Sequence, residues 1–148
     1  MKIILICFLS MITISFPDAK AGNDGDEITG IWLTHTQTAK VTIFGSGKYY
    51  YGKITWLKEH NRPDGKPKYD EHNPDSKLKS RPIFGLLLLS GFEYDANSKQ
   101  WINGEIYDPK NGKTYSCKLT LTDKNTLEVR GYVGISLIGR TEVWKRSE

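Results

Sequence analysis

TLEVRGYVGISLIGRTEVWK, residues 126–145, is the stretch of this sequence that decides the fold. Apolar and polar residues alternate in two runs, Leu127–Val133 and Ser136–Trp144, on either side of a glycine-bracketed bend at Gly134. Such alternation is typical of strands that bury one face, and two runs joined by a short bend predict a β-hairpin. The chain therefore ends in an antiparallel pair of strands whose outer edge needs a partner.

The partner for that edge lies at the other end of the chain. An apolar edge strand left unpaired invites aggregation, and pairing it with the first strand removes the edge. The segment Ile28–Thr34 reads as a strand by the same criteria. We therefore expect Ile28–Thr34 to pair with the last strand and to close the sheet into a barrel.

Eight strands follow one another along the chain, and each can pair with its neighbour. Turn residues separate them, most clearly in Asp108–Lys113, where Pro109 fixes φ and Gly112 accepts a positive φ. The expected strands are Ile28–Thr34, Ala39–Phe44, Lys48–Leu57, Ile83–Tyr94, Gln100–Tyr107, Thr114–Leu121, Leu127–Val133 and Ser136–Trp144. The predicted fold is all-β, a single antiparallel eight-stranded up-and-down barrel, whose interior is either filled by side chains or holds one small ligand.

A long polar loop, Lys58–Pro82, separates the third strand from the fourth. It carries four prolines, many charges and few aliphatic residues. A segment of this length without strands is usually a lid, a functional loop or a disordered stretch. Within it, Asn73 is a candidate cap for a helical turn that begins at Pro74. After it, the apolar run Leu86–Leu89 predicts a segment that is buried on both faces.

The first 21 residues predict a signal peptide rather than part of the fold. Lys2 precedes the apolar run Ile3–Phe16, and Ala19-Lys20-Ala21 has the small-x-small pattern after which signal peptidase cuts. A retained membrane anchor is the alternative, but the apolar run is short and charge follows it closely. We expect residues 1–21 to be removed, residues 22–148 to form one domain, and the protein to be secreted across the inner membrane into the periplasm.

Charge and cysteine content argue against two kinds of function. The net charge of +4 falls to +3 when Lys2, Lys20 and Asp18 leave with the signal peptide, and this mild excess is spread along the chain, unlike the basic patch of a nucleic-acid-binding protein. Cys117 is then the single cysteine and has no partner for a disulfide within the chain. Its place among the apolar positions of Thr114–Leu121 favours a buried side chain over a reactive thiol.

The residue spacings of known metal and catalytic sites are missing. The histidines, His35, His60 and His72, lack the close pairing of zinc ligands. Asp70, Asn73 and Asp75 have the spacing of oxygen ligands in a calcium-binding loop. The glycine and the bidentate glutamate that complete such a loop are missing. The sequence around Ser136 resembles a nucleophile elbow, but its second glycine comes one residue late. We expect no metal, no cofactor and no catalytic residues, and we rank an enzyme below a binding function.

Arginines and tyrosines form the remaining candidate site. Seven residues are candidates to ring the mouth of a cavity and to hold a carboxylate or phosphate by bidentate contacts: Arg81, Arg130 and Arg140, with Tyr107, Tyr115, Tyr132 and Asp108. The alternative is that each arginine pairs with a carboxylate on an adjacent strand, such as Glu105, Glu128 or Glu142, as on an ordinary sheet surface. Residue spacing favours this second interpretation.

Three long segments resemble the signature blocks of a bacterial family of small exported proteins, domain of unknown function 2147. They are SRPIFG (residues 80–85), GEIYDPKNGKTY (residues 104–115) and RGYVGISLIGRT (residues 130–141). The resemblance covers nearly all of residues 22–148. It implies no established activity and no catalytic residue.

A second, shorter resemblance concerns the fold. Gly30-x-Trp32 in the first strand, with an arginine in the last, is similar to lipocalin-type barrels, in which the arginine packs across the tryptophan and closes one end. This resemblance implies that Trp32 and Arg140 are in contact. Stacking of a guanidinium on an indole contributes about 0.5–2 kcal/mol.

The sequence leads to two hypotheses about function. In the first, the protein is a non-catalytic periplasmic module that binds a small apolar or amphipathic ligand in the barrel, with Lys58–Pro82 as a lid. In the second, it is a cell-envelope protein-interaction module with a filled barrel, and the same loop docks a partner. A cavity of roughly 300 Å³ or more favours the first hypothesis.

Overall fold

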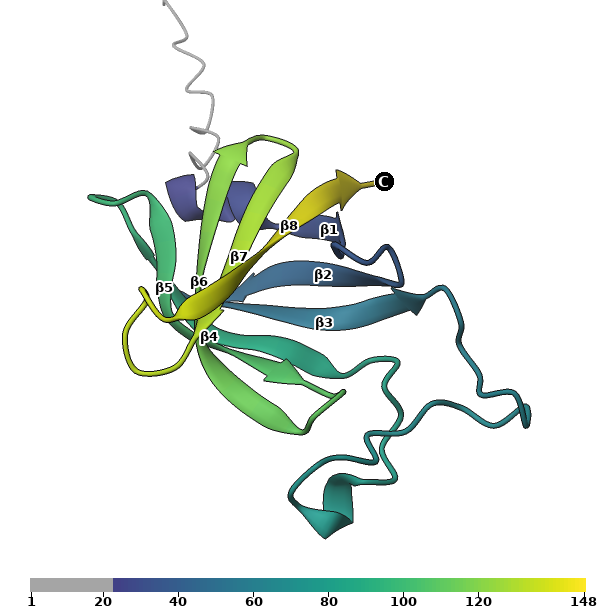
Figure 1. Cartoon of the computed structure of the whole chain (residues 1–148). Coiled ribbons are helices and arrows are strands. Elements are labelled where there is room, and N and C mark those ends of the chain that lie inside the picture. Colours follow the sequence, from purple (N-terminus) through teal and green to yellow (C-terminus); the bar gives the residue numbers. More distant parts are fainter. Residues whose placement is uncertain (1–22) are drawn as a thin grey trace, which may run out of the picture.

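The chain folds into a closed barrel of eight antiparallel strands, in which each strand pairs with its neighbours in sequence and the last pairs with the first (Figure 1). The computed structural model describes residues 23–148, so the predicted signal peptide lies outside the described residues. The strands are β1 (Gly30–Leu33), β2 (Ala39–Ser46), β3 (Tyr49–Leu57), β4 (Leu87–Asp95), β5 (Gln100–Asp108), β6 (Lys113–Asp123), β7 (Thr126–Tyr132) and β8 (Gly139–Ser147). The predicted all-β up-and-down barrel is confirmed.

The last hairpin differs from its prediction in where β8 begins and ends. β8 starts at Gly139 rather than Ser136, and it continues past Trp144 to Ser147. The apolar residues Leu137 and Ile138, predicted to lie at the start of this strand, belong instead to an exposed loop, residues 133–138. Pairing with β1 accounts for the extra length, because it uses the last three residues of β8.

The contact that closes the barrel involves Arg146 and not Arg140. The guanidinium of Arg146 lies over the Trp32 ring, 4.3 Å from its centroid, and these two residues are register partners between β8 and β1. Arg140 lies at the opposite end of β8, where it pairs with Gly131. The predicted contact between Trp32 and Arg140 is therefore wrong, although the pairing of the first and last strands is right.

A short 3-10 helix, η1 (Asp24–Ile28), covers the same end of the barrel, which we call the closed end (Figure 1). Three buried or half-buried side chains donate hydrogen bonds to it. The Trp32 Nε1–H donates to the Ile28 carbonyl at 2.8 Å, and the Trp101 Nε1–H to the Gly25 carbonyl at 3.1 Å. The Tyr50 hydroxyl donates to Asp26 Oδ1 at 2.9 Å.

Gly30 makes room for the closing arginine. Its φ of +128° is a conformation that residues with a side chain rarely adopt, and a Cβ at this position would lie 2.7 Å from Arg146 Nη1. That guanidinium also donates to the carbonyls of Thr29 and Glu27, at 2.8 Å and 2.7 Å, and to the Lys124 carbonyl at 2.7 Å. The glycine of the Gly-x-Trp motif thus lets one arginine join η1, β1 and β8.

The core fills the half of the barrel next to the closed end with large side chains. Its largest fully buried members are Trp32, Trp101, Trp144, Phe92, Ile28 and Ile43. Cys117 is fully buried among them, as its place in β6 predicts. The run Leu86–Leu89 differs from its prediction, because Leu86 and Leu89 are buried whereas Leu87 is 45% exposed. Over residues 23–148, helices reach at most five residues, far short of a membrane span.

Candidate ligand cavity

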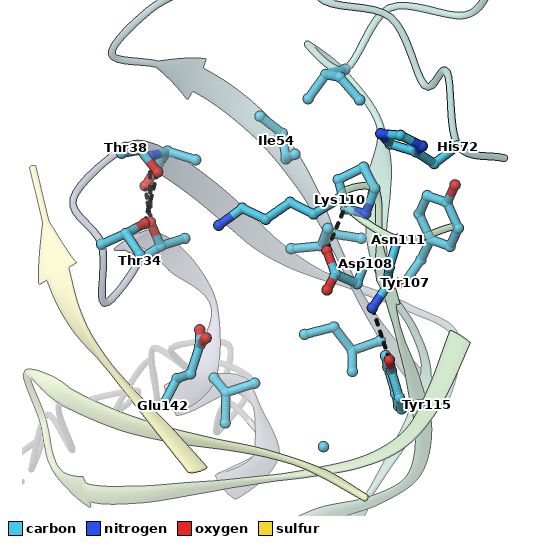
Figure 2. A pocket seen from close by; sticks show the side chains of 18 of the residues that line it. Thr34, Thr38, Ile54, His72, Tyr107, Asp108, Lys110, Asn111, Tyr115 and Glu142 are labelled. Carbon is cyan, nitrogen blue, oxygen red and sulfur yellow. Dashed lines mark hydrogen bonds between the residues drawn. The ribbon is translucent and has the colours of Figure 1, made fainter. Parts of the chain in front are cut away.

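The end of the barrel opposite η1 holds a cavity of about 1210 Å³ that opens to solvent. We call this end the open end. Its walls come from the strands and from four connections: the β1–β2 turn, the long β3–β4 loop, the β5–β6 turn and the β7–β8 connection. Figure 2 shows side chains from the first three of these connections facing a common space.

The deeper part of the cavity is apolar. Inward-facing residues of five strands form it: Ile54, Leu88, Ile106, Val129 and Trp144. A register shift between Lys40 and Val41 of β2 changes which side chains face inward at the end of β3. Val41 pairs with Ile54, whereas Lys40 pairs with Trp56, so one residue of β3 is skipped between the two pairs. Trp56 consequently lies outside with Lys40 5.8 Å from its ring centroid, and Leu57 lines the cavity.

The rim of the cavity is polar and carries both signs of charge. The Asp108–Lys113 turn contributes Asp108, whose carboxylate accepts the Lys110 backbone N–H at 2.9 Å, and Asn111, whose amide donates to the Tyr115 hydroxyl at 2.9 Å. In Figure 2 the Lys110 side chain extends across the space between the walls. Glu142 enters from β8, where it accepts the Trp144 indole N–H at 3.2 Å. A molecule in the cavity would contact charged groups at the rim and apolar side chains below it.

The long β3–β4 loop is held to the outer wall of the barrel by one buried carboxylate. Asp70 has no exposed surface. One of its oxygens accepts the Tyr107 hydroxyl at 2.6 Å; the other accepts Asn73 Nδ2 at 2.8 Å and Arg81 Nε and Nη2 at 2.9 Å and 2.8 Å. We call these four residues the loop anchor. Because Tyr107 belongs to β5 and the other three to the loop, the anchor ties the loop to the sheet.

The anchor shifts the pKa of its carboxyl group. Burial raises the pKa of Asp70, but the hydrogen bonds from Tyr107, Asn73 and Arg81 and the charge of Arg81 outweigh burial, so the pKa lies below its usual value. The neighbouring Tyr107 shows the opposite effect, since burial and its hydrogen bond to Asp70 raise its pKa. Asp70 is therefore ionised at neutral pH.

The same loop packs closely against the β5–β6 turn. A Cβ at Gly112, whose φ is +71°, would overlap the His72 carbonyl, so only glycine allows this approach. The short helical turn is η2 (Ser76–Leu78), and its cap is Asp75, which accepts the Lys77 backbone N–H at 3.0 Å, rather than Asn73. Asn73 is buried in the anchor instead. The loop is thus an ordered part of the cavity wall.

The structure brings together five of the seven residues predicted to ring the cavity. Those that line it are Tyr107, Asp108, Tyr115, Tyr132 and Arg140, whereas Arg81 and Arg130 do not line it. Arg81 is engaged by Asp70 and borders a smaller pocket of about 250 Å³ on the outside of the sheet. Of the three predicted arginines, Arg140 therefore lies at the cavity, and Arg81 and Arg130 lie outside its lining.

Arg130 organises the β7–β8 connection. Its Nε donates to the Ser136 carbonyl at 2.6 Å, its Nη2 to the Leu137 carbonyl at 3.4 Å, and its Nη1 to the Thr141 hydroxyl at 2.8 Å. The alternative, in which each of the three predicted arginines pairs with a carboxylate on an adjacent strand, differs from the structure: Arg81 pairs with Asp70 of the loop, and Arg140 lies 3.8 Å from Glu142, two residues away on the same strand.

Reasoning from the sequence missed Lys110 and Glu142 as cavity residues. Lys110 was assigned to a turn, and Glu142 to the outer surface of the sheet. The usable signal was the parity of β8: Glu142 lies two residues before Trp144, so both side chains face inward. Within the described part of the chain, His, Cys, Asp and Glu form no group of three that would suit a metal ion.

A comparison with solved structures agrees with this architecture. The solved structure titled "Protein HP1028 from the human pathogen Helicobacter pylori belongs to the lipocalin family" superposes with a TM-score of 0.71 at 23% sequence identity, over 82% of this chain and 83% of that one. At this identity the match shows the fold alone, a lipocalin-like barrel. Curated proteins contain no significant match to the sequence. Residues 30–146 match the family described as "Uncharacterized protein conserved in bacteria (DUF2147)", and the chain therefore belongs to this family.

Proposed function

We propose that this protein binds a small apolar or amphipathic molecule in the open-end cavity, without catalysis. The cavity itself carries the proposal, because its volume of about 1210 Å³ exceeds that of most drug-sized ligand sites, roughly 300–1,000 Å³. The lipocalin-like fold supports the proposal by analogy. The second hypothesis required a filled barrel, and only the half next to η1 is filled.

The lining favours a ligand with an apolar body and a polar end. Below the rim the ligand would contact Ile54, Ile106 and Val129, and burial of its apolar surface contributes about 25 cal/mol per Å². At the rim, Lys110 and Arg140 are cations that suit an anionic group, whereas Glu142 and Asp108 repel one. An elongated molecule bearing a carboxylate or phosphate at one end fits this distribution.

The proposal places the protein in the periplasm. The support comes from the sequence: a charged start, an apolar run too short for a confident span, and Ala19-Lys20-Ala21. Mass spectrometry of protein from the native cell envelope tests this, because a periplasmic protein is expected to begin at Gly22.

Gly131 allows a direct test of the cavity. It lies on the lining, and a Cβ there would lie 3.5 Å from Ile106 Cγ2 and 3.8 Å from Tyr115 Cβ, which are ordinary contacts. In Gly131→Leu the new side chain is therefore expected to enter the cavity without displacing the backbone. With dansyl-undecanoic acid as the probe, we expect affinity to fall at least about tenfold, as measured by fluorescence titration.

Glu128→Leu is the matched control, because it adds the same side chain to the outer face of the same strand, where Glu128 pairs with Val143. It should leave the affinity unchanged, and both variants should keep the circular dichroism spectrum of the parent. Equal affinity of Gly131→Leu and the parent would place the probe elsewhere. Absence of binding, together with no copurified small molecule in native mass spectrometry, would overturn the proposal.

A further inference from the structure

The β7–β8 connection exposes a concentrated set of aliphatic side chains. In residues 133–138, here called the apolar loop, four side chains are between 57% and 84% exposed: Val133, Ile135, Leu137 and Ile138. Soluble proteins expose single aliphatic residues routinely, but a contiguous apolar patch marks a site of interaction. Four such residues within six consecutive positions concentrate exposed apolar surface on one loop.

The fold presents this loop in a defined shape. Arg130 binds the carbonyls of Ser136 and Leu137, and the Ile138 N–H donates to the Ile135 carbonyl at 3.1 Å. These bonds satisfy polar groups of the loop backbone internally. A loop that enters a water-poor environment needs its backbone groups to be hydrogen-bonded within the protein, because burying an unpaired carbonyl there costs free energy.

The charged residues that directly flank the loop in sequence are positive. Between Val129 and Thr141 the sequence contains two arginines, Arg130 and Arg140, and no carboxylate. The side chain of Arg140 is 80% exposed. Aliphatic residues flanked by basic ones suit a surface that is apolar inside and negatively charged outside, as a membrane with anionic lipids is.

We propose that the apolar loop docks the protein on an anionic lipid surface by inserting Ile135 and Leu137 among the acyl chains. The size of the patch favours a lipid surface over a protein. A stable protein interface takes about 800 Å² from each partner, which a six-residue hairpin tip does not supply. Insertion into a bilayer interface needs only a few aliphatic side chains and adjacent cations.

The loop also continues into the cavity wall. Val133 and Ile138 are exposed on the loop and line the cavity, and Arg140 stands at the rim. A docked barrel would therefore present its open end to the membrane, giving an amphipathic molecule a continuous apolar route between the two. This route rests on the proposed ligand-binding function, whereas the docking itself does not.

Vesicle co-sedimentation of the full chain tests the docking. With vesicles of phosphatidylglycerol and phosphatidylethanolamine, the double variant Ile135→Ser/Leu137→Ser is expected to show a partition coefficient at least about tenfold lower than the parent. Leu78→Ser/Leu87→Ser is the matched control, since both residues are exposed aliphatics outside the loop, 37% and 45% exposed. It should bind like the parent. Because all variants carry the same N-terminal segment, the difference between them isolates the loop.

The charge requirement is tested with the same proteins. The parent is expected to bind neutral phosphatidylcholine vesicles more weakly, and added salt should weaken its binding to the anionic ones. Equal binding of the loop variant and the parent overturns the proposal. A different result also overturns the proposal: the parent binds no vesicles but self-associates in light scattering, and the loop variant does not self-associate. The loop would then contact a second copy of this chain.

The loop variant and the cavity variant test membrane docking and ligand binding independently of each other. Ile135 and Leu137 do not line the cavity, so their serine variant should keep the affinity for dansyl-undecanoic acid in solution. Gly131→Leu should lose that affinity and keep vesicle binding. Loss of vesicle binding in the loop variant therefore supports docking even if the cavity proves to bind nothing.

Discussion

At the scale of single residues, three arginines of the C-terminal hairpin have three different roles. Arg146 joins η1, β1 and β8 at the closed end, Arg130 shapes the apolar loop, and Arg140 stands at the rim of the cavity. Arg140 and Arg146 face the same side of β8 because they are six residues apart. Only their position along the strand distinguishes them.

Replacing Arg146 is expected to destabilise the fold far more than replacing Arg140. Arg146→Ala removes three charge-assisted hydrogen bonds and the contact with Trp32, and should lower the free energy of unfolding by about 2–4 kcal/mol. Arg146→Lys should recover little of this, because an ammonium cannot make the guanidinium's planar fork of contacts. Arg140→Ala should change it by less than about 0.5 kcal/mol. Urea denaturation measures all three, and equal effects at both positions would contradict the assignment.

At the scale of elements, the β3–β4 loop is the one that sequence reasoning described least well. Composition alone suggested a lid, a functional loop or a disordered stretch, but the loop anchor and the contact of His72 with Gly112 hold it against β5 and the β5–β6 turn. A loop fastened in this way serves as a cavity wall rather than as a swinging lid.

Acid should release the loop. Asp70 has a pKa below its usual value in the folded protein, so its contribution is present above the unfolded value of about 3.9 and is lost as pH falls through the folded pKa. Hydrogen exchange of residues 58–82 is therefore expected to speed up, beyond the intrinsic pH effect on exchange, only below about pH 4. Asp70→Asn should loosen the loop at neutral pH and remove this dependence.

Asp64→Asn provides the control for acid release, because Asp64 lies in the same loop but is exposed. It should retain the transition seen in the parent. A loop that stays protected well below the pH at which Asp70 protonates would show that packing, and not the anchor, holds it.

At the scale of the whole molecule, the barrel is divided between a filled half and a hollow half. Tryptophans and η1 close one end, and an apolar-floored cavity with a charged rim occupies the other. The stability of such a barrel resides in the filled half, which leaves the hollow half available for binding. A ligand site in the hollow half therefore lowers the free energy of unfolding only slightly.

Cys117 reports on global opening of the filled half. Its side chain is fully buried, and burial raises the pKa of its thiol to about 12, so the thiolate is scarce at pH 8. Labelling by iodoacetamide, read by mass spectrometry on the peptide that carries Cys117, should be at least about a thousandfold slower in native buffer than in denaturant. Rapid labelling of the native protein would show that this half of the barrel opens locally.

The sequence by itself determined the fold class, the number and order of the strands, the pairing of first with last, and the burial of Cys117. These follow from alternation with period two and from turn chemistry, both of which are local properties of the chain. Segment resemblance determined the family as well.

Only the tertiary structure decided which arginine meets Trp32, which charged residues face the cavity, and what holds the long loop. Alternation assigns a residue to a face of the sheet, but not to an end of the barrel, because the position along the axis depends on the register between β8 and β1. Likewise, Asp70 has partners 3, 11 and 37 residues away, and no local pattern links them. Contacts between distant segments arise from closure of the sheet, and closure is a property of the whole chain.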